Sequence, residues 1–354
     1  MSALVEQAQL VKTSWLTPSR AGIALLFVAA YGIVPFTASG YLLDAILTPF
    51  LALALAAVGL NVLTGYAGQV SLGSAAFMAV GAYAAYNFNL RIPELPLLFS
   101  LVLAGVVAAA VGLVFGLPSL RLRGFYLAVS TLAAQFFVQW ALTKFAWFSN
   151  DNPSGVIDAP PLSIAGALLT GAPGRYVFCL TIVVVATFLT VRLLGSQSGR
   201  NFIAVRDHEV AAKVIGVPVL RTKLLAFGVS SFLVGIAGVL WAFAYLRTVE
   251  PDGFNLDRSF QILFIIIIGG LASIRGSFLG AAFIVVFPLL LSRVGEALLG
   301  NVFDSGVLEM SQRIVIGGLI IVFLIAEPKG LVALVDRLEE QVSRHAGRLK
   351  RRFI

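Results

Sequence analysis

A run of small and polar residues interrupts the apolar sequence between positions 61 and 74. The run contains three glycines from Gly65 to Gly73 and carries no charge. Non-helical backbone of this kind offers free amide and carbonyl dipoles to small polar solutes in several classes of transporter. The alternative is that the glycines only allow helices to pack closely. Under the first interpretation, the residues expected along a translocation path are Asn61, Gln69, Ser71 and Ser74.

A second segment, residues 199–218, is polar and basic and lies between two apolar windows. Its pattern predicts a short helix with a clean end, because Gly216 and Pro218 are helix stop signals. Ala211 and Ala212 are small, so the surface of another protein could approach this helix closely. The alternative is an amphipathic connector with a solvated polar face.

The composition places both segments in a membrane protein. Of the 354 residues, 59% are hydrophobic and 12% are charged, whereas a soluble domain averages about 25% charged residues. At about 20 residues per spanning helix, the chain has room for about ten spans and no ordinary soluble domain. We therefore expect an all-α polytopic membrane protein with about ten transmembrane helices. The apolar windows lie near residues 21–38, 42–62, 71–88, 96–117, 125–142, 176–194, 223–245, 259–274, 278–299 and 314–326.

The distribution of basic residues predicts the orientation. Most of the 25 Lys and Arg residues fall in inner loops when the N-terminus is cytoplasmic, as the positive-inside rule requires. An even number of spans then makes the C-terminus cytoplasmic too. We divide the chain into a cytoplasmic N-terminal segment (1–20), a transmembrane domain (21–327) and a basic cytoplasmic tail (328–354). Within the domain, the loop at 145–175 is expected outside and the loop at 195–222 inside.

Residues for catalysis or metal binding are not grouped in this sequence. The chain has 1 Cys and 2 His, and Cys179, His208 and His345 lack the spacing of metal ligands or of a nucleophile with its base. There is no Gly-x-x-x-x-Gly-Lys-Ser/Thr phosphate loop, so ATP cannot bind by that route. An enzyme is disfavoured, and no cofactor or metal is expected on this chain. The basic surplus indicates contact with membrane lipid and not with nucleic acid.

Two sets of motifs resemble one family of transporters. Positions 209, 211–212 and 216 hold a Glu, an Ala pair and a Gly, which resembles the cytoplasmic coupling loop of permease subunits in bacterial ATP-binding-cassette (ABC) importers, with the Ala pair displaced by one position. The segments 61–73, 117–124 and 269–276 are similar to the branched-chain amino acid permease family of the LivM type. The similarity covers about residues 40 to 330. Ala272 and Ser277 depart from the Gly and Pro that the family often has there.

The resemblance implies one subunit of an importer in the bacterial inner membrane. With a homologous LivH-type permease, it would form the path for branched-chain amino acids or a related small polar solute. Two cytoplasmic ATPase subunits would bind ATP, and a periplasmic solute-binding protein would deliver the solute. The residues that the resemblance places against an ATPase are Arg206, Glu209, Ala211, Ala212 and Gly216.

The resemblance also implies an inverted repeat of spans 2–5 and 7–10, which the similar fragments 74–77 and 280–283 support. The alternative function is an ion-coupled secondary transporter. Such coupling usually requires an ionisable residue inside the bundle, and Asp44 and Glu296 lie near span ends instead. Close helix packing is the favoured role of the later glycines, Gly269, Gly270, Gly276 and Gly280.

Overall fold

The computed structural model describes residues 27–119, 125–152, 156–164, 167–169, 171–299 and 330–337, with positions 314, 317, 318 and 321. The predicted N-terminal segment, most of the tenth apolar window and most of the basic tail lie outside the described residues. The described part consists of helices and the loops that connect them, with four strands of two residues each.

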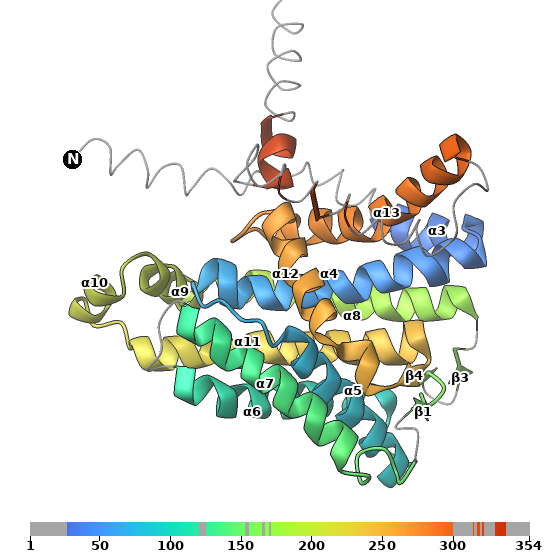
Figure 1. The fold of residues 1–354 in the computed structure, drawn as a ribbon, viewed down its shortest axis with the longest axis horizontal. Coiled ribbons are helices and arrows are strands. Elements are labelled where there is room, and N and C mark those ends of the chain that lie inside the picture. Colours follow the sequence, from blue (N-terminus) through green and yellow to red (C-terminus); the bar gives the residue numbers. More distant parts are fainter. Residues whose placement is uncertain are drawn as a thin grey trace, which may run out of the picture.

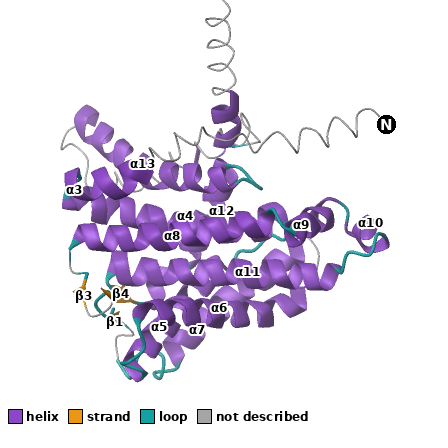
Figure 2. Cartoon of the chain, turned by 180° about the vertical axis from the view of Figure 1, so that it is seen from behind, coloured by secondary structure: helices purple, strands orange, loops and turns teal. Residues whose placement is uncertain are grey.

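Several long helices lie side by side along the longest axis of the molecule, and others cross this axis obliquely (Figure 1). Seen from behind, the same arrangement shows short loops at the two ends of the helices (Figure 2). The long helices are α4 (Thr48–Asn61), α5 (Ser74–Arg91), α6 (Leu97–Ser119), α7 (Phe125–Lys144), α8 (Ala172–Leu194), α11 (Val219–Val239), α12 (Leu256–Gly269) and α13 (Ile274–Leu299).

Shorter elements extend or connect these helices. π-Helical turns are η1 (Ala29–Ile33), η2 (Leu42–Leu47), η3 (Val62–Tyr66) and η4 (Leu240–Leu246), and η5 (Pro251–Phe254) is a 3₁₀ turn. The short α-helices are α3 (Val34–Thr37), α9 (Gln197–Asp207) and α10 (Glu209–Val214). The strands are β1 (Ile157–Asp158), β2 (Ser163–Ile164), β3 (Ala167–Leu168) and β4 (Thr248–Val249).

Five helices of the described part are long and apolar enough to cross a membrane: Leu42–Tyr66, Leu97–Leu117, Ala172–Leu194, Val219–Leu246 and Ile274–Leu291. The prediction of an all-α membrane protein is confirmed, whereas the number of ten spans stays a prediction. The eighth window shows why counting windows is not enough. There, α12 has 14 residues, which extend about 21 Å at 1.5 Å per residue, less than the roughly 30 Å of a hydrocarbon core.

Helix α11 lies at the centre of the bundle, where it packs on α4, α5 and α6. The contact with α5 brings backbone against backbone, because a Cβ on Gly238 would lie 2.0 Å from the Met78 carbonyl oxygen. Glycines also join α12 and α13: a Cβ on Gly280 would lie 2.0 Å from the Ile265 carbonyl oxygen. The packing role predicted for the later glycines is confirmed at this position, as expected where small residues let membrane helices approach.

The two ends of the bundle differ in content. One end carries α9 and α10, and the opposite end carries β1, β3 and β4 (Figure 1); we call these the α10 end and the strand end. At the strand end, β1 pairs antiparallel with β4, with Ile157 opposite Val249. The predicted loops at 145–175 and 195–222 therefore lie at opposite ends of the molecule, as the topology requires.

Candidate functional site

The polar run between α4 and α5 is a break in the helical structure. α4 continues into η3 (Val62–Tyr66), residues 67–73 are not helical, and α5 begins at Ser74. We call residues 67–73 the interrupted segment. It extends from the α10 end toward the middle of the molecule, where α5 starts (Figure 1). Gly68 has a φ of +69°, a conformation that glycine adopts without steric cost. The predicted interruption is confirmed.

A similar break follows α11. The helix continues into η4 and then leaves helical geometry at Arg247, whose φ is +62°. β4 and η5 follow, and α12 begins at Leu256. Each of the two long helices therefore ends in a π-helical turn, a non-helical stretch comes next, and a new helix starts.

The first turns of α5 and α12 are joined by hydrogen bonds. The Ala75 backbone N–H donates to Ser259 Oγ at 2.9 Å, and the Ala76 N–H donates to Gln135 Oε1 at 2.6 Å. Ser259 Oγ also donates to Gln135 Oε1 at 3.1 Å, and Gln135 Nε2 donates to the Phe254 carbonyl at 2.8 Å. In this conformation, two of the N-terminal amides of α5 are satisfied by the protein and are not free for a solute.

Sequence reasoning missed this junction. Gln135 and Ser259 are 1% exposed, and each is an uncharged polar residue inside an apolar window. That signal was available, because polar side chains within membrane helices usually hydrogen bond to a neighbouring helix. The identity of the partner was not available, since Gln135 contacts residues 59 and 124 positions away.

Asn61, one of the four predicted path residues, is 0% exposed. Its Nδ2 donates to the Ser273 carbonyl at 2.9 Å and to Ser277 Oγ at 3.0 Å. Its Oδ1 accepts from the Ala272 N–H at 2.9 Å. Asn61 thus ties the end of α4 to the connection between α12 and α13, and its amide is used within the chain.

The other three path residues lie together in the interrupted segment and at the start of α5. Gln69, Ser71 and Ser74 are between 1% and 4% exposed. The Gly73 N–H donates to Ser71 Oγ at 3.3 Å. Gln69 Nε2 is buried without a hydrogen-bond partner among the described residues. The structure therefore groups three polar residues where the helix is broken, and their role in transport stays a prediction.

The loop at 195–222 contains two helices, so the prediction of one short helix is wrong. α9 ends at Asp207, His208 is extended with φ −150° and ψ 91°, and α10 then begins. The predicted stop is confirmed: Gly216 has a φ of +87°. The Val217 N–H donates to the Ala212 carbonyl at 2.9 Å, which is the hydrogen bond of a Schellman C-cap.

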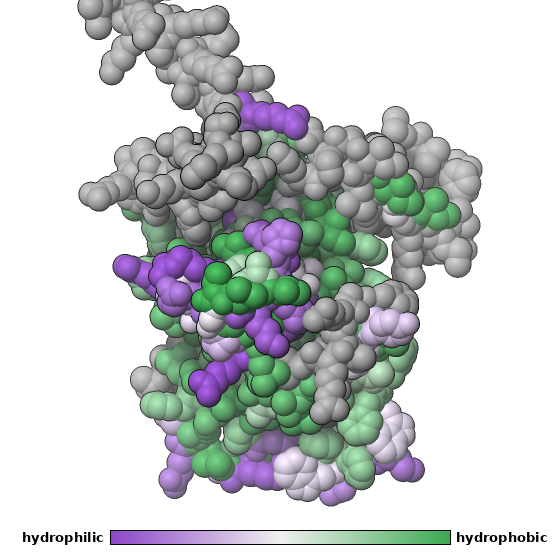
Figure 3. All heavy atoms as spheres, turned by 90° about the vertical axis from the view of Figure 1, so that its left-hand side faces the viewer, coloured by the Kyte–Doolittle hydropathy of each residue, from purple (hydrophilic) through white to green (hydrophobic). Residues whose placement is uncertain are grey.

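α10 presents an apolar face outward. Val210, Val214 and Ile215 have exposures of 71%, 82% and 75%; we call these three residues the apolar tip. Figure 3 views the α10 end and shows a hydrophobic patch with hydrophilic side chains beside it. The spacing of Val210 and Val214, four residues apart in a polar loop, was a signal that sequence reasoning overlooked.

The residues that the sequence placed against an ATPase divide between the two faces of α10. Ala211 and Gly216 are exposed, but Ala212 is 2% exposed, so the expectation that both alanines face a partner is corrected. Glu209 Oε2 forms an ion pair with Lys223 Nζ of α11 at 3.0 Å. This ion pair joins the start of α10 to the transmembrane bundle.

Arg206, the remaining residue of that set, is in the last turn of α9. Its Nη1 donates to the carbonyl oxygen of Gly65 at 2.9 Å, and its Nε donates to Asp207 Oδ1 at 2.8 Å. The guanidinium therefore contacts the turn that precedes the interrupted segment.

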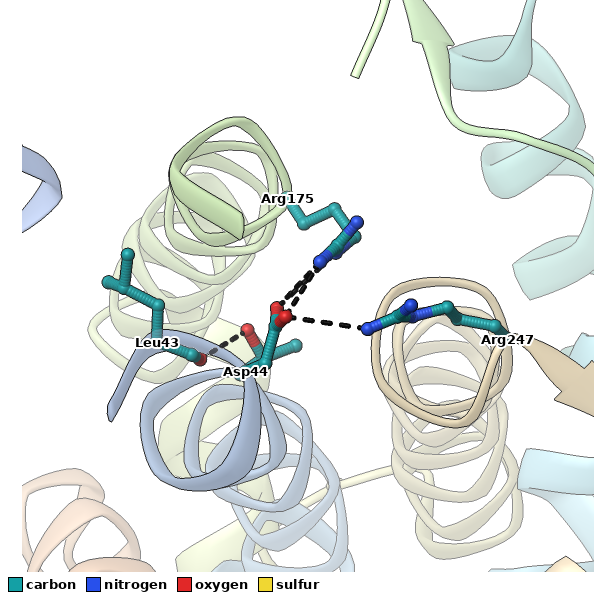
Figure 4. Close-up of polar contacts among 5 residues, drawn as sticks. Leu43, Asp44, Arg175 and Arg247 are labelled. Carbon is teal, nitrogen blue, oxygen red and sulfur yellow. Dashed lines mark hydrogen bonds and ion pairs between the residues drawn. The ribbon is translucent and has the colours of Figure 1, made fainter. Parts of the chain in front are cut away.

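At the strand end, one carboxylate lies between two arginines from different helices (Figure 4). Arg175 Nη2 of α8 is 2.7 Å from Asp44 Oδ2, and Arg247 Nη2 is 3.4 Å from the same oxygen. The Arg175 side chain is 11% exposed and that of Asp44 is 30% exposed. Asp44 therefore joins η2, α8 and the end of η4, and is already paired with cations at the edge of the bundle.

We expect Asp44→Asn to destabilise the folded protein, because two guanidinium groups would lose their shared counter-charge. A hydrogen bond to a charged group contributes about 1.5–3 kcal/mol, and partial exposure of Asp44 moves the expected loss to the lower end. Thermal unfolding of the detergent-purified protein measures it. Asp158→Asn, at an exposed carboxylate of the same end, is the control. Equal unfolding temperatures for the two variants would contradict the structural role of Asp44.

Comparison with known proteins identifies the family. The family described as the permease component of branched-chain amino acid transport systems matches residues 42–324. The high-affinity branched-chain amino acid transport system permease protein LivM of Salmonella typhimurium is 30% identical over 300 residues, which cover 78% of this chain and 67% of that protein. LivM of Escherichia coli gives the same identity and coverage.

A more distant relative is named for a different substrate. The L-arabinose transport system permease protein AraH of Escherichia coli is 23% identical over 280 residues, covering 76% of this chain and 82% of AraH. No solved structure matches the chain. Because the family match extends over most of the chain, this multi-pass helical protein belongs to the family of permease components of branched-chain amino acid transport systems.

Proposed function

We propose that this chain is a permease subunit of an ABC importer in the bacterial inner membrane. It pairs with a second permease of the LivH type, and the two enclose the solute path. Two ATPase subunits bind ATP and drive the cycle, a periplasmic binding protein supplies the solute, and this chain binds no cofactor. The observation that carries the proposal is the apolar tip, an exposed apolar surface held at the end of the molecule opposite the strands.

The apolar tip has the properties of a protein-docking site. Apolar side chains exposed together in water mark an interaction surface, and apolar anchors within a polar rim are typical of interface centres. The tip is also held in place, since the Schellman cap ends α10 and the Glu209–Lys223 ion pair ties it to α11. A push on the tip is therefore carried to α11. We therefore assign the α10 end to the cytoplasmic side, and the positive-inside rule favours cytoplasmic chain termini.

The two interrupted helices support the proposed inverted repeat. The continuous helix formed by η2, α4 and η3 runs from Asp44 at the strand end to Gly65, which contacts α9. The helix formed by α11 and η4 runs the other way, from the α10 connection to Arg247, which contacts Asp44. Two similar helix breaks in opposite directions are what an inverted repeat requires. We place the path where the two breaks meet, lined by Gln69, Ser71 and Ser74, with Asn61 nearby.

The solute is a branched-chain amino acid or another small polar molecule. A zwitterion has two charged ends and no net charge, so peptide and amide dipoles at a helix break can bind it without a counter-ion. The relatives' names extend from branched-chain amino acids to L-arabinose, so the solute must be found by experiment.

Transport in liposomes tests the proposal. The vesicles contain this chain, the second permease and the ATPases, with the binding protein outside, and ATP is supplied to the ATPases. We expect ATP-dependent uptake of leucine, urea, L-arabinose or a small carboxylate, with faster ATP hydrolysis when that solute and the binding protein are present. Omission of the ATPases is the control. Uptake that follows an ion gradient without ATP would replace this proposal by a secondary transporter.

A further inference from the structure

Arg206 lies in the last turn of α9, where α9 contacts η3. Its guanidinium donates to the Gly65 carbonyl at 2.9 Å, and Asp207 Oδ1 is 2.8 Å from both Nε and Nη2. The last carbonyls of a helix have no partner within the helix, and the end that carries them favours a cation. Arg206 supplies both the hydrogen bond and the charge, while Asp207 fixes the orientation of the planar guanidinium.

The stem of Arg206 also packs on the interrupted segment itself. A Cβ placed on Gly68 would be 2.7 Å from Arg206 Cγ and 3.3 Å from Arg206 Cα. No side chain separates the backbone of this segment from α9 at that point. Arg206 therefore contacts the start of the segment in two ways, through a hydrogen bond to the carbonyl of Gly65 before it and through van der Waals contact with Gly68 within it.

Gly65 also packs against the connection between α12 and α13. A Cβ on Gly65 would lie 2.4 Å from the backbone nitrogen of Ala272, and Asn61 hydrogen bonds with that nitrogen and with the Ser273 carbonyl. A displacement of Gly65 must therefore move residues 270–273, which join α12 to α13. Arg206 thus contacts Gly65 directly, and Gly65 in turn packs against the connection between α12 and α13.

We propose that Arg206 transmits movement of α9 and α10 to the interrupted segment, and that it does not serve as a docking residue for the ATPase. This inference rests on the proposed function and assigns separate roles within it. The apolar tip binds the ATPase, and Arg206 couples the resulting movement of α9 and α10 to residues 67–73. Arg206 is a positioning residue, because it acts through the backbone of Gly65 and Gly68.

The experiment compares Arg206→Ala and Arg206→Lys with Arg200→Ala. Arg200 is an exposed arginine of the same helix, and its hydrogen bonds go to Gln197 and Gly195. The variant Arg200→Ala therefore removes the same charge without changing a contact with the interrupted segment. Lysine keeps the charge but has no planar fork, so it should retain part of the function. All variants are studied in the full complex with the second permease and the ATPases.

The first readout is amide hydrogen exchange by mass spectrometry. Arg206→Ala is expected to raise exchange in peptides covering residues 63–73 and to leave residues 209–217 unchanged, while Arg200→Ala changes neither. The second readout is ATP hydrolysis with and without the solute-loaded binding protein. We expect Arg206→Ala to keep the ATPases bound and the basal rate unchanged, while stimulation and uptake fall at least about fivefold, a typical coupling effect. Arg206→Lys should lie between.

Two results would overturn the inference. Loss of the ATPases from the purified Arg206→Ala complex would make Arg206 a docking residue, and unchanged exchange at residues 63–73 would show that it does not hold the segment. Failure of the proposed function gives a different result, because the unmodified complex would then show no ATP-dependent uptake. Hydrogen exchange in residues 63–73 of Arg206→Ala and Arg200→Ala would still show whether Arg206 holds the segment.

Discussion

Val214→Asp combined with Ile215→Asp is expected to separate the ATPase subunits from this permease. The two side chains are 82% and 75% exposed, so the substitutions leave the fold intact in the free subunit. In the docked complex, two carboxylates would enter a surface from which water is excluded. Hot-spot residues, which cluster near the centre of an interface, cost about 2 kcal/mol or more when altered. If the apolar tip is such a hot spot, binding should weaken by about thirtyfold or more. Co-purification of the ATPases with the tagged permease measures it.

The matched control introduces two carboxylates at the same end but away from the apolar tip. Gln197→Asp with Asn201→Asp changes two α9 residues that hydrogen bond with each other. This control should retain the ATPases, and ATP-dependent uptake should persist, whereas the tip variant loses both. Full retention of the ATPases by the Val214 and Ile215 variant would mean that another surface docks them, and the proposed coupling role of α10 would be wrong.

The break after α4 and the end of α10 were predictable from the sequence, because their cause is local. Three glycines from Gly65 to Gly73 without a charged residue mark the break between α4 and α5, and Gly216 ends α10 by a left-handed conformation that favours glycine. The break at His208 was not predictable from these signals. No glycine or proline stands there, and the residues on both sides are compatible with a helix, so the extended conformation depends on how α9 and α10 pack.

The direction of side chains was the part that sequence reasoning could not supply. α10 has six residues, fewer than two turns, so its periodicity does not show which face lies inward. Ala212 is buried and Val214 exposed, the reverse of an assignment by hydrophobicity alone. Arg206 was expected to lie against an ATPase, but its guanidinium donates to a backbone carbonyl 141 positions away, and no pattern in the sequence identifies that partner.

Gly65→Ala is expected to prevent α4 from closing against the connection between α12 and α13. The new Cβ would lie 2.0 Å from Asn61 Oδ1 and 2.4 Å from the Ala272 nitrogen. Asn61 cannot move away without losing buried hydrogen bonds. Overpacking costs about 1–3 kcal/mol, and an unsatisfied buried polar group costs about 1–3 kcal/mol more. Thermal unfolding in detergent should show a much less stable protein.

Gly228→Ala is the matched control for this variant. Gly228 lies within α11, and the nearest atoms to its added Cβ would be side-chain carbons of Leu113 at 3.6 Å or more, an ordinary contact. Alanine is more favourable than glycine in a helix by about 0.8–1 kcal/mol, so the Gly228→Ala protein should be as stable as the unmodified protein or more stable.

Asn61→Ala in the Gly65→Ala background separates the two clashes. If the Asn61 contact dominates, the double variant will be no less stable than Asn61→Ala alone; if the Ala272 backbone dominates, the two losses will add. If Gly65→Ala is as stable as the unmodified protein, residues 270–273 can move away from Gly65 at no cost. The proposed mechanical connection between Gly65 and the α12–α13 connection would then be wrong.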